Sequence, residues 1–296
     1  MTVDGSPPQA PAGWWGGMLA RLRCGQPTRA KSRREVILYY SHFCSPAVLR
    51  EIARLRDELG SSYDIFAVGY CRSSGALSGI ECVPAREYSA NDLTALPYPG
   101  KAQQFDPSNF IGNADLVPMK FFLERPDYDH YWIIEYDVRF SGPWPDLFAD
   151  LSASDADLLC TTMQRWPENP NWAHWNTLST GAEDVPLEHR VKGFLPFCRA
   201  SRALLAACDA RYRSGWSGHS EVVWPTVASL GGFLLEDLGG NGSFTPAARR
   251  GRYYQNTPSE WSQFPGTFVF RPSFADRNLF GPQCHFKGTL WHPVKE

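Results

Sequence analysis

Two acidic residues, one position apart, end an apolar run in the middle of the chain. Glu135 and Asp137 follow Tyr131–Ile134, whose β-branched pair is typical of a buried strand. Side chains two apart on a strand point the same way, so both carboxylates would face one cleft if the strand extends to Asp137. Two close carboxylates repel each other unless a positive charge lies between them. A divalent cation that carries a phosphorylated ligand fits this chemistry, and a strand that runs into two solvated acids is the alternative.

Histidine and lysine residues near the end of the sequence offer partners for these acids. His285, Lys287 and His292 lie within ten residues of one another. One imidazole would complete a metal site with Asp137, and Lys287 would face a diphosphate. Each histidine taken singly also fits an ordinary surface or core position.

Alternating strands and helices position the acids in the first half of the chain. A strand over 36–40, a helix from Pro46 to Gly60 with Ser45 as its N-cap, and a strand over 63–70 form a βαβ unit, which is expected to be parallel and right-handed. Further strands are predicted over 79–84, 131–135 and 157–162, and further helices over 116–125 and 144–151.

This alternation predicts an α/β sheet covered by helices on both faces. Open α/β sheets bind ligands at the carboxyl ends of their strands. The acid pair and the polar turn Ser41-His42, which follows the first strand, would therefore meet at one edge of the sheet. A nucleotide lying across that edge would contact both.

The second half of the chain has a different character. Residues 163–195 read as a long loop region, 198–213 as a helix, 221–230 as a helix with Pro225 in an early turn, and 232–236 as a short strand. Four tryptophans would either stack on an acceptor sugar or serve as packing residues: Trp166, Trp172, Trp175 and Trp216. We expect a flexible segment over 1–33 and one domain over 34–296, with halves 34–162 and 163–296.

Composition limits the classes of partner. A formal net charge of −2 gives no bulk electrostatic reason to bind nucleic acid or an anionic membrane. The 8 cysteines form no C-x-x-C pair, so a structural zinc site is not indicated. No secretory signal peptide is recognisable, which favours a cytoplasmic protein with free thiols. The segment Trp14–Arg23 would give weak contact with a membrane surface, or form a frayed tail.

Ile133–Val138, with its E-Y-D version of the D-x-D motif, resembles the GT-A-fold glycosyltransferases. The run 131–144 and the closing stretch 288–295 are similar to an uncharacterised branch of that superfamily. The resemblance covers most of 35–296 at the level of the fold, while only these short motifs are specific. It implies a GT-A-like, Rossmann-like, mostly parallel sheet flanked by helices, followed by an irregular acceptor-binding half.

The resemblance also implies roles for the donor-binding residues. Asp137 would bind Mn²⁺ or Mg²⁺ on the diphosphate of a nucleotide sugar. Glu135, which stands in the place of the first Asp, would contact the ribose or the metal and its water. His292 would supply a further metal ligand, with His285 in reserve. Apart from the resemblance, the sheet edge and charge predict that Ser41 and His42 contact the nucleotide and that Lys287 faces its diphosphate.

In inverting members of the superfamily a carboxylate at a helix start acts as the general base. Glu221, after Gly218-His219-Ser220, matches that place and would take the proton of the acceptor hydroxyl. In a retaining enzyme Glu221 need not be a base, and a first-turn acid favoured by the helix dipole is the structural alternative.

The sequence thus predicts a metal-dependent glycosyltransferase that moves a sugar from a nucleotide-sugar donor to a glycan or lipid-linked acceptor. One alternative is a glycoside hydrolase that pairs Glu135 or Asp137 with Glu221 and needs neither metal nor nucleotide. The other is a non-catalytic relative that binds carbohydrate or a partner.

Overall fold

The computed structural model describes residues 33–255, 266–276 and 287–295. The predicted flexible segment 1–33 (apart from Arg33), the segment Trp14–Arg23 and the reserve ligand His285 lie outside the described residues.

A seven-stranded mixed sheet, with the strand order β3-β2-β1-β4-β7-β6-β8, forms the centre of the fold. Within it, β7 is antiparallel to both of its neighbours and the other pairs are parallel, which confirms the predicted α/β fold with a mostly parallel sheet. The strands are β1 (Glu35–Tyr40), β2 (Asp64–Tyr70), β3 (Ala85–Tyr88), β4 (His130–Glu135), β6 (Leu158–Arg165), β7 (Val191–Ser201) and β8 (Leu235–Asp237).

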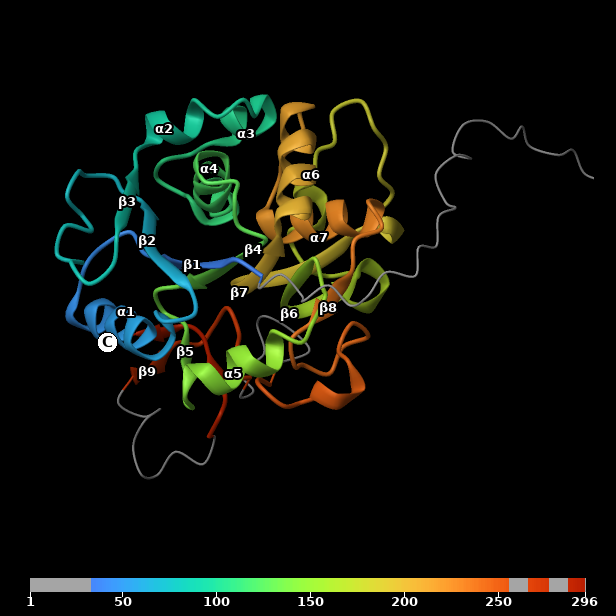
Figure 1. Cartoon of the computed structure of the whole chain (residues 1–296). Helices are drawn as coiled ribbons and strands as arrows, with labels where there is room; N and C mark the ends of the chain where they lie inside the picture. Colours follow the sequence, from blue (N-terminus) through green and yellow to red (C-terminus); the bar gives the residue numbers. More distant parts are fainter. Residues whose placement is uncertain (1–32, 256–265, 277–286, 296) are drawn as a thin grey trace, which may run out of the picture. The chain divides into compact units, whose positions relative to one another are not determined.

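Helices cover both faces of this sheet, as the sequence predicts (Figure 1). One face carries α2 (Ala90–Thr94), α3 (Pro99–Gln104), α4 (Leu116–Glu124), α6 (Arg202–Arg213) and α7 (Ser220–Leu230), and the other carries α1 (Pro46–Leu59) and α5 (Trp144–Leu151). Each strand contributes side chains to the cores on both faces of the sheet, because successive side chains point to opposite faces. In β1, Val36 and Leu38 belong to the core under α4 and α6, while Ile37 and Tyr39 belong to the core over α1 and α5.

The start of α1 shows how local sequence sets these elements. Ser45 is the N-cap, its hydroxyl accepts a hydrogen bond from the Val48 amide at 3.4 Å, and Pro46 occupies the first helical position. This confirms the predicted start of the helix and fixes the turn in which Ser41 and His42 lie.

Two predicted elements are wrong. The structure has no strand over 79–84; the third strand is β3, and the carboxylate of Glu87 instead holds the preceding loop by accepting from the Gly75 and Leu77 amides at 2.7 and 2.6 Å. The predicted helix 198–213 begins only at Arg202, because 198–201 pair with β4 as part of β7. Ser201 caps α6 by accepting from the Leu204 amide at 3.1 Å.

The C-terminal part of the chain returns to the turn after β4. We call residues 266–276 and 287–295 the C-terminal strap. It contains β9 (Phe274–Ala275), β10 (Leu290–Trp291) and β11 (Val294–Lys295); β10 pairs with β5 (Arg139–Phe140) and β11 pairs with β9. The Val294 amide donates to the Asp137 carbonyl at 2.8 Å, so the strap is joined directly to the acidic turn.

In the described part of the chain, every helix falls short of the length and apolarity that a membrane crossing requires. The six cysteines that the described ranges contain are free thiols.

Candidate functional site

Glu135, Asp137 and His292 come together at the carboxyl end of β4. The strand ends at Glu135, and Asp137 lies in the following turn, so the turn and not strand periodicity brings the two acids together. The Nε2 atom of His292 is 3.5 Å from Asp137 Oδ1 and 3.9 Å from Glu135 Oε2. One ligand atom from each residue lies within 4.8 Å of the others, so the three side chains are close enough to hold a cation together.

The imidazole of His292 is oriented for a ligand role. Its Nδ1 lies 2.8 Å from the carbonyl oxygen of Val269, which can only accept a hydrogen bond. When the ring is neutral, this contact favours the proton on Nδ1 and leaves the lone pair of Nε2 facing the acids; when the ring is protonated, Nε2–H faces them instead. The ring also packs against Phe194 and Phe268, with centroids 5.1 and 5.3 Å away, so its plane is fixed.

Asp137 Oδ1 has no hydrogen-bond partner among the described residues, although the side chain is buried. A buried carboxylate oxygen without a partner is rare and costly, because burial removes its water. Together with the lone pair of His292 Nε2, this oxygen suits a divalent cation, so the residues present fit the metal that the D-x-D resemblance implies.

The two carboxylates differ in their affinity for a proton. Burial, reinforced by the negative charge of Asp137, raises the pKa of Glu135 to about 7. Burial alone would also raise the pKa of Asp137, but interactions with His292 and Lys295 outweigh it and lower the pKa to about 2. In this pair, Asp137 loses its proton first and stays ionised. Glu135 loses its proton at higher pH, or when a bound cation favours its ionised form.

Lys295 is a site residue that the sequence interpretation did not select. Its ammonium group donates to Asp137 Oδ2 at 2.6 Å and to the Tyr136 hydroxyl at 2.8 Å, and its side chain is 46% exposed. Lys287, which was predicted for the diphosphate, is exposed, and its neighbour Gly288 packs against Gly142. The position of Lys295, three residues after His292, was the signal that could have identified it.

The turn after β1 lies beside the acidic turn, as predicted. Tyr40 is paired with Glu135 across β1 and β4, and the Tyr136 amide donates to the Tyr40 carbonyl at 2.8 Å. Ser41 is buried, and its hydroxyl donates to the Phe43 carbonyl at 2.7 Å. The exposed ring of His42 lies edge-on to Tyr136, with centroids 5.2 Å apart.

A pocket of about 370 Å³ opens beyond His42 at the carboxyl ends of β2 and β3. Its lining consists of Tyr70, Cys71, Arg72, Ser89, Ala90, Asn91 and Pro107. Partial burial, then the charge of Lys295, lowers the pKa of His42, and Arg72 adds to this effect while Asp137 opposes it. His42 thus feels the charges of Lys295 and Asp137 in the acidic site and of Arg72, which lines the pocket.

Glu221 lies in the first turn of α7, and its side chain is 15% exposed. The Leu195 amide donates to Glu221 Oε1 at 3.5 Å, and the Nδ1 atom of His219 is 3.9 Å from Oε2. Burial, followed by the charges of Glu135 and Glu221, raises the pKa of the Cys198 thiol. The contact with Leu195 places the Glu221 carboxylate against β7, on the face of the sheet that α7 covers (Figure 1).

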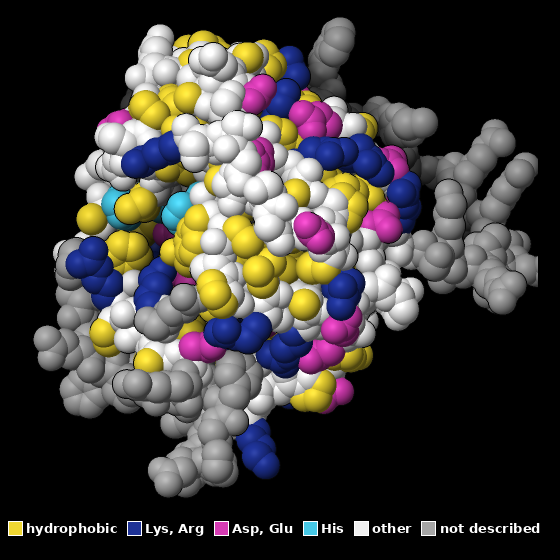
Figure 2. Space-filling view, turned by 90° about the vertical axis from the view of Figure 1, so that its left-hand side faces the viewer, with side chains coloured by type: hydrophobic (Ala, Val, Ile, Leu, Met, Phe, Trp, Pro, Cys, Tyr) yellow, Lys and Arg dark blue, Asp and Glu magenta, His cyan; other side chains and the backbone are white. Residues whose placement is uncertain are grey.

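The tryptophans of the second half are mostly packing residues. Trp172, Trp175 and Trp216 are buried in the core under α6 and α7. Trp166 is partly buried and packs against that core. Figure 2 shows one face of the molecule where histidine, lysine and arginine side chains lie beside a recess in which acidic side chains are partly visible.

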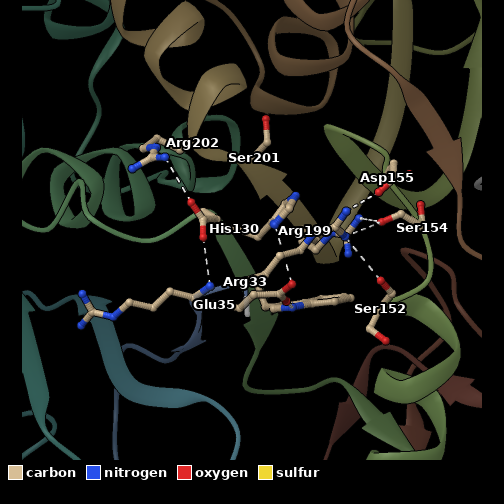
Figure 3. Close-up of polar contacts among 12 residues, drawn as sticks. Arg33, Glu35, His130, Ser152, Ser154, Asp155, Arg199, Ser201 and Arg202 are labelled. Atoms are coloured by element: carbon tan, nitrogen blue, oxygen red, sulfur yellow. Dashed lines mark hydrogen bonds and ion pairs between the residues drawn. The ribbon is translucent and has the colours of Figure 1, made fainter. Parts of the chain in front are cut away.

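A second buried polar cluster lies at the opposite edge of the sheet, where β1 and β4 begin (Figure 3). The guanidinium of Arg199 donates to the Ser154 and Ala156 carbonyls at 2.7 and 3.1 Å. Glu35 lies 3.7 Å from His130 Nδ1 and accepts a hydrogen bond at 2.7 Å from the indole of Trp132. These groups join three strands and a loop, which is a structural role.

Comparisons by sequence give no family: no family model matches the chain, and no curated protein matches it. Several solved structures are similar to this chain in fold, with low sequence identity. Core-mannan synthase A from Aspergillus fumigatus, in its Mn/GDP form, has a TM-score of 0.35 and 12% identity, and the match covers 79% of this chain and 83% of that one.

Two further structures give values of the same size. The galactosyltransferase LgtC, in complex with donor and acceptor sugar analogues, has a TM-score of 0.39 and 9% identity over 68% of this chain and 73% of its own. A protein described as a glucose-1-phosphate thymidylyltransferase from Bacillus anthracis, in complex with sucrose, has a TM-score of 0.38 and 10% identity over 69% of this chain and 85% of its own.

Proposed function

We propose that the chain is a cation-dependent glycosyltransferase that moves a sugar from a nucleotide-sugar donor to a glycan or lipid-linked acceptor. The observation that carries this proposal is the buried Oδ1 atom of Asp137, which lacks a hydrogen-bond partner among the described residues and lies 3.5 Å from His292 Nε2. Such an oxygen is costly unless a ligand satisfies it. A divalent cation satisfies it and attracts a diphosphate.

Asp137, His292 and Glu135 would hold Mn²⁺ or Mg²⁺. Bound there, the cation would neutralise negative charge on the diphosphate as it leaves. Asp137 is the anchor, because its low pKa keeps it ionised at any physiological pH. The hydrogen bond between His292 Nδ1 and Val269 keeps the imidazole in the tautomer that a cation requires.

The donor would extend from the acidic turn toward the pocket beyond His42. Lys295 would turn its ammonium group to a diphosphate oxygen, since this partly exposed cation already lies beside Asp137. The nucleoside would follow the edge formed by Ser41, His42 and Tyr136 and enter the pocket lined by Tyr70 and Arg72.

Glu221 would act as the general base of an inverting transfer. It would accept the proton of the acceptor hydroxyl as that oxygen forms a bond to the anomeric carbon of the donor sugar. The bond between the anomeric carbon and the diphosphate oxygen breaks at the same time, and the nucleoside diphosphate departs with the electron pair. The position of Glu221 at the start of α7, with its carboxylate held against β7 by the Leu195 amide, supports this role.

Isothermal titration of the full chain with UDP, GDP and CMP, each with and without Mn²⁺, tests the proposal. We expect a nucleoside diphosphate to bind more tightly with Mn²⁺, and Asp137→Asn to remove the Mn²⁺-dependent part. The matched control is Asp127→Asn, which alters a 46% exposed acid before β4, at the opposite edge of the sheet. This control should bind as the parent does.

Two results would overturn the proposal. One is the absence of binding by every nucleotide, and the other is binding that Asp137→Asn leaves unchanged. Hydrolysis of a glycan in EDTA without any nucleotide sugar would instead identify a glycoside hydrolase that pairs Glu221 with one of the strand-end acids.

A further inference from the structure

The backbone on both sides of Asp137 is held by one buried arginine. Arg139, in β5, is 4% exposed, and its Nη1 donates to the carbonyl oxygens of Tyr136 and Val138 at 2.7 and 2.8 Å. These carbonyls belong to the two residues that flank Asp137. The Asp137 carbonyl itself accepts from the Val294 amide of the strap. Every carbonyl of this three-residue turn is therefore bound by Arg139 or by the C-terminal strap.

The other side of the same guanidinium faces two carboxylates. Arg139 Nε lies 3.4 Å from Asp276 Oδ1 in the strap and 3.7 Å from Glu51 Oε2 in α1. Glu51 has a second partner, because its Oε1 accepts from the Trp144 indole at 2.9 Å. Asp276 Oδ1 is buried and has no hydrogen bond within the described ranges, so this oxygen relies on its ion pair with Arg139, while Oδ2 lies 3.7 Å from Arg50 in α1.

We infer that Arg139 and Asp276 are positioning residues that align the Asp137 turn with His292 and Lys295. This inference rests on the proposed function, since it concerns the geometry of the same cation site. Arg139 fixes the turn through two carbonyls, and the pair with Asp276 fixes the strap segment beside β11, which carries Lys295 and follows His292. The acids and the imidazole come from distant parts of the chain, and this pair adds a direct ionic connection between those parts.

The chemistry of the guanidinium explains why an arginine stands here. Burying a cation is costly unless its donors are paired, and the planar fork of Arg139 serves carbonyls and carboxylates in different directions at once. A lysine would keep the charge and lose that geometry. Partners that orient metal ligands without touching the metal typically change metal affinity 10–100-fold when they are replaced.

The test compares two isosteric variants that each remove one carboxylate from Arg139. Asp276→Asn breaks the connection to the strap, and Glu51→Gln, the matched control, breaks a connection to α1. For the full chain, Mn²⁺ affinity is measured by electron paramagnetic resonance of free Mn²⁺, and amide exchange at Val294 is followed by NMR without any metal. We expect Asp276→Asn to weaken Mn²⁺ binding roughly 10–100-fold and to speed exchange at Val294.

The control should keep the Mn²⁺ affinity of the parent, even where its melting temperature falls. Arg139→Lys should behave as Asp276→Asn does, and the double variant should add little to either single change. Equal effects of Asp276→Asn and Glu51→Gln on both readouts would mean a general stability role and would overturn the inference. A parent that binds no Mn²⁺ would refute the proposed function, while the exchange rate at Val294 would still decide whether the pair positions the strap.

Discussion

The Nε2 atom of His292 lies 3.5 Å from the Oδ1 atom of Asp137, although most of the second half of the chain separates the two residues in sequence. Pairing of β10 with β5, two residues after Asp137, produces this proximity. The imidazole is held by Val269 within the strap, so its position depends on the strap as a unit.

Replacing His292 by Gln should weaken Mn²⁺ binding by at least about tenfold, because the variant loses the only nitrogen ligand of the three-residue cluster that the described residues form. Titration of the protein with Mn²⁺, followed by paramagnetic resonance, measures this change. His189→Gln, at an exposed histidine in the loop before β7, serves as the control and should retain the parent affinity. Unchanged binding by the His292 variant would exclude the imidazole as a ligand.

Replacing Lys295 by Met should lower the affinity for a nucleoside diphosphate about tenfold or more, since a charged hydrogen bond contributes about 1.5–3 kcal/mol. Lys287→Met provides the comparison, because Lys287 is exposed and is the lysine that the sequence predicts for the diphosphate. Calorimetry with UDP and GDP distinguishes the two lysines. If Lys287→Met, and not Lys295→Met, lowers the affinity for the nucleoside diphosphate, Lys287 has the role that the sequence predicts for it.

Replacing Glu221 by Gln should reduce kcat about 10²–10⁴-fold, as expected for loss of a general base, while the affinity for nucleotide and Mn²⁺ stays the same. The donor and acceptor must first be identified by screening sugar nucleotides against glycans. Equal losses in kcat and in nucleotide affinity would point to a structural role at the start of α7. Undiminished turnover would contradict the base assignment and favour a retaining reaction.

The buried histidine at the opposite edge should make the protein less stable in acid. Burial, then the charges of Arg199 and Arg33, lowers the pKa of His130 from 6.5 to about 4 in the folded chain. The unfolded chain therefore takes up a proton as pH falls below about 6.5, and the folded chain takes it up only near 4. The contribution of His130 to the free energy of unfolding is fully present above pH 6.5. It decreases as pH falls from 6.5 to about 4, by roughly 1–2 kcal/mol with allowance for screening.

Urea unfolding at pH 7.5 and pH 5.0 measures this effect. His130→Gln cannot take up the proton, so its stability should change less between the two pH values than that of the parent. An identical decrease in both proteins would assign the acid sensitivity to other groups, of which His219, with a pKa lowered to about 3 chiefly by burial, is one.

Much of the fold could be predicted from local sequence. The apolar runs of β1, β2 and β4 and the Ser45–Pro46 start of α1 were recognisable because each depends on neighbouring residues. The strand β7 was not, because Gly193 and Pro196 interrupt its pattern. Gly193 is required by packing, since a Cβ atom there would lie 2.5 Å from the sulfur of Cys160. The contact between Gly193 and Cys160 joins two different strands, so it cannot be predicted from the residues around Gly193 alone.

The candidate site was predicted in part. Glu135, Asp137 and His292 come together as the sequence interpretation required, although a turn and not an extended strand aligns the acids. The contact of Lys295 with Asp137 was not predicted, because the direction of this side chain depends on how the strap pairs with β5 and β9, while the role predicted for Lys287 stays a prediction. Arg139 was missed for the same reason: its partners come from the acidic turn, α1 and the strap.

The contact between Lys295 and Asp137 has a consequence for how the protein is assembled. An internal ammonium group already lies against this acid, so the chain itself supplies a countercharge for Asp137. If the proposed cation binds here, it would join a turn whose charge the chain already balances, and a chelator should remove that cation without unfolding the protein.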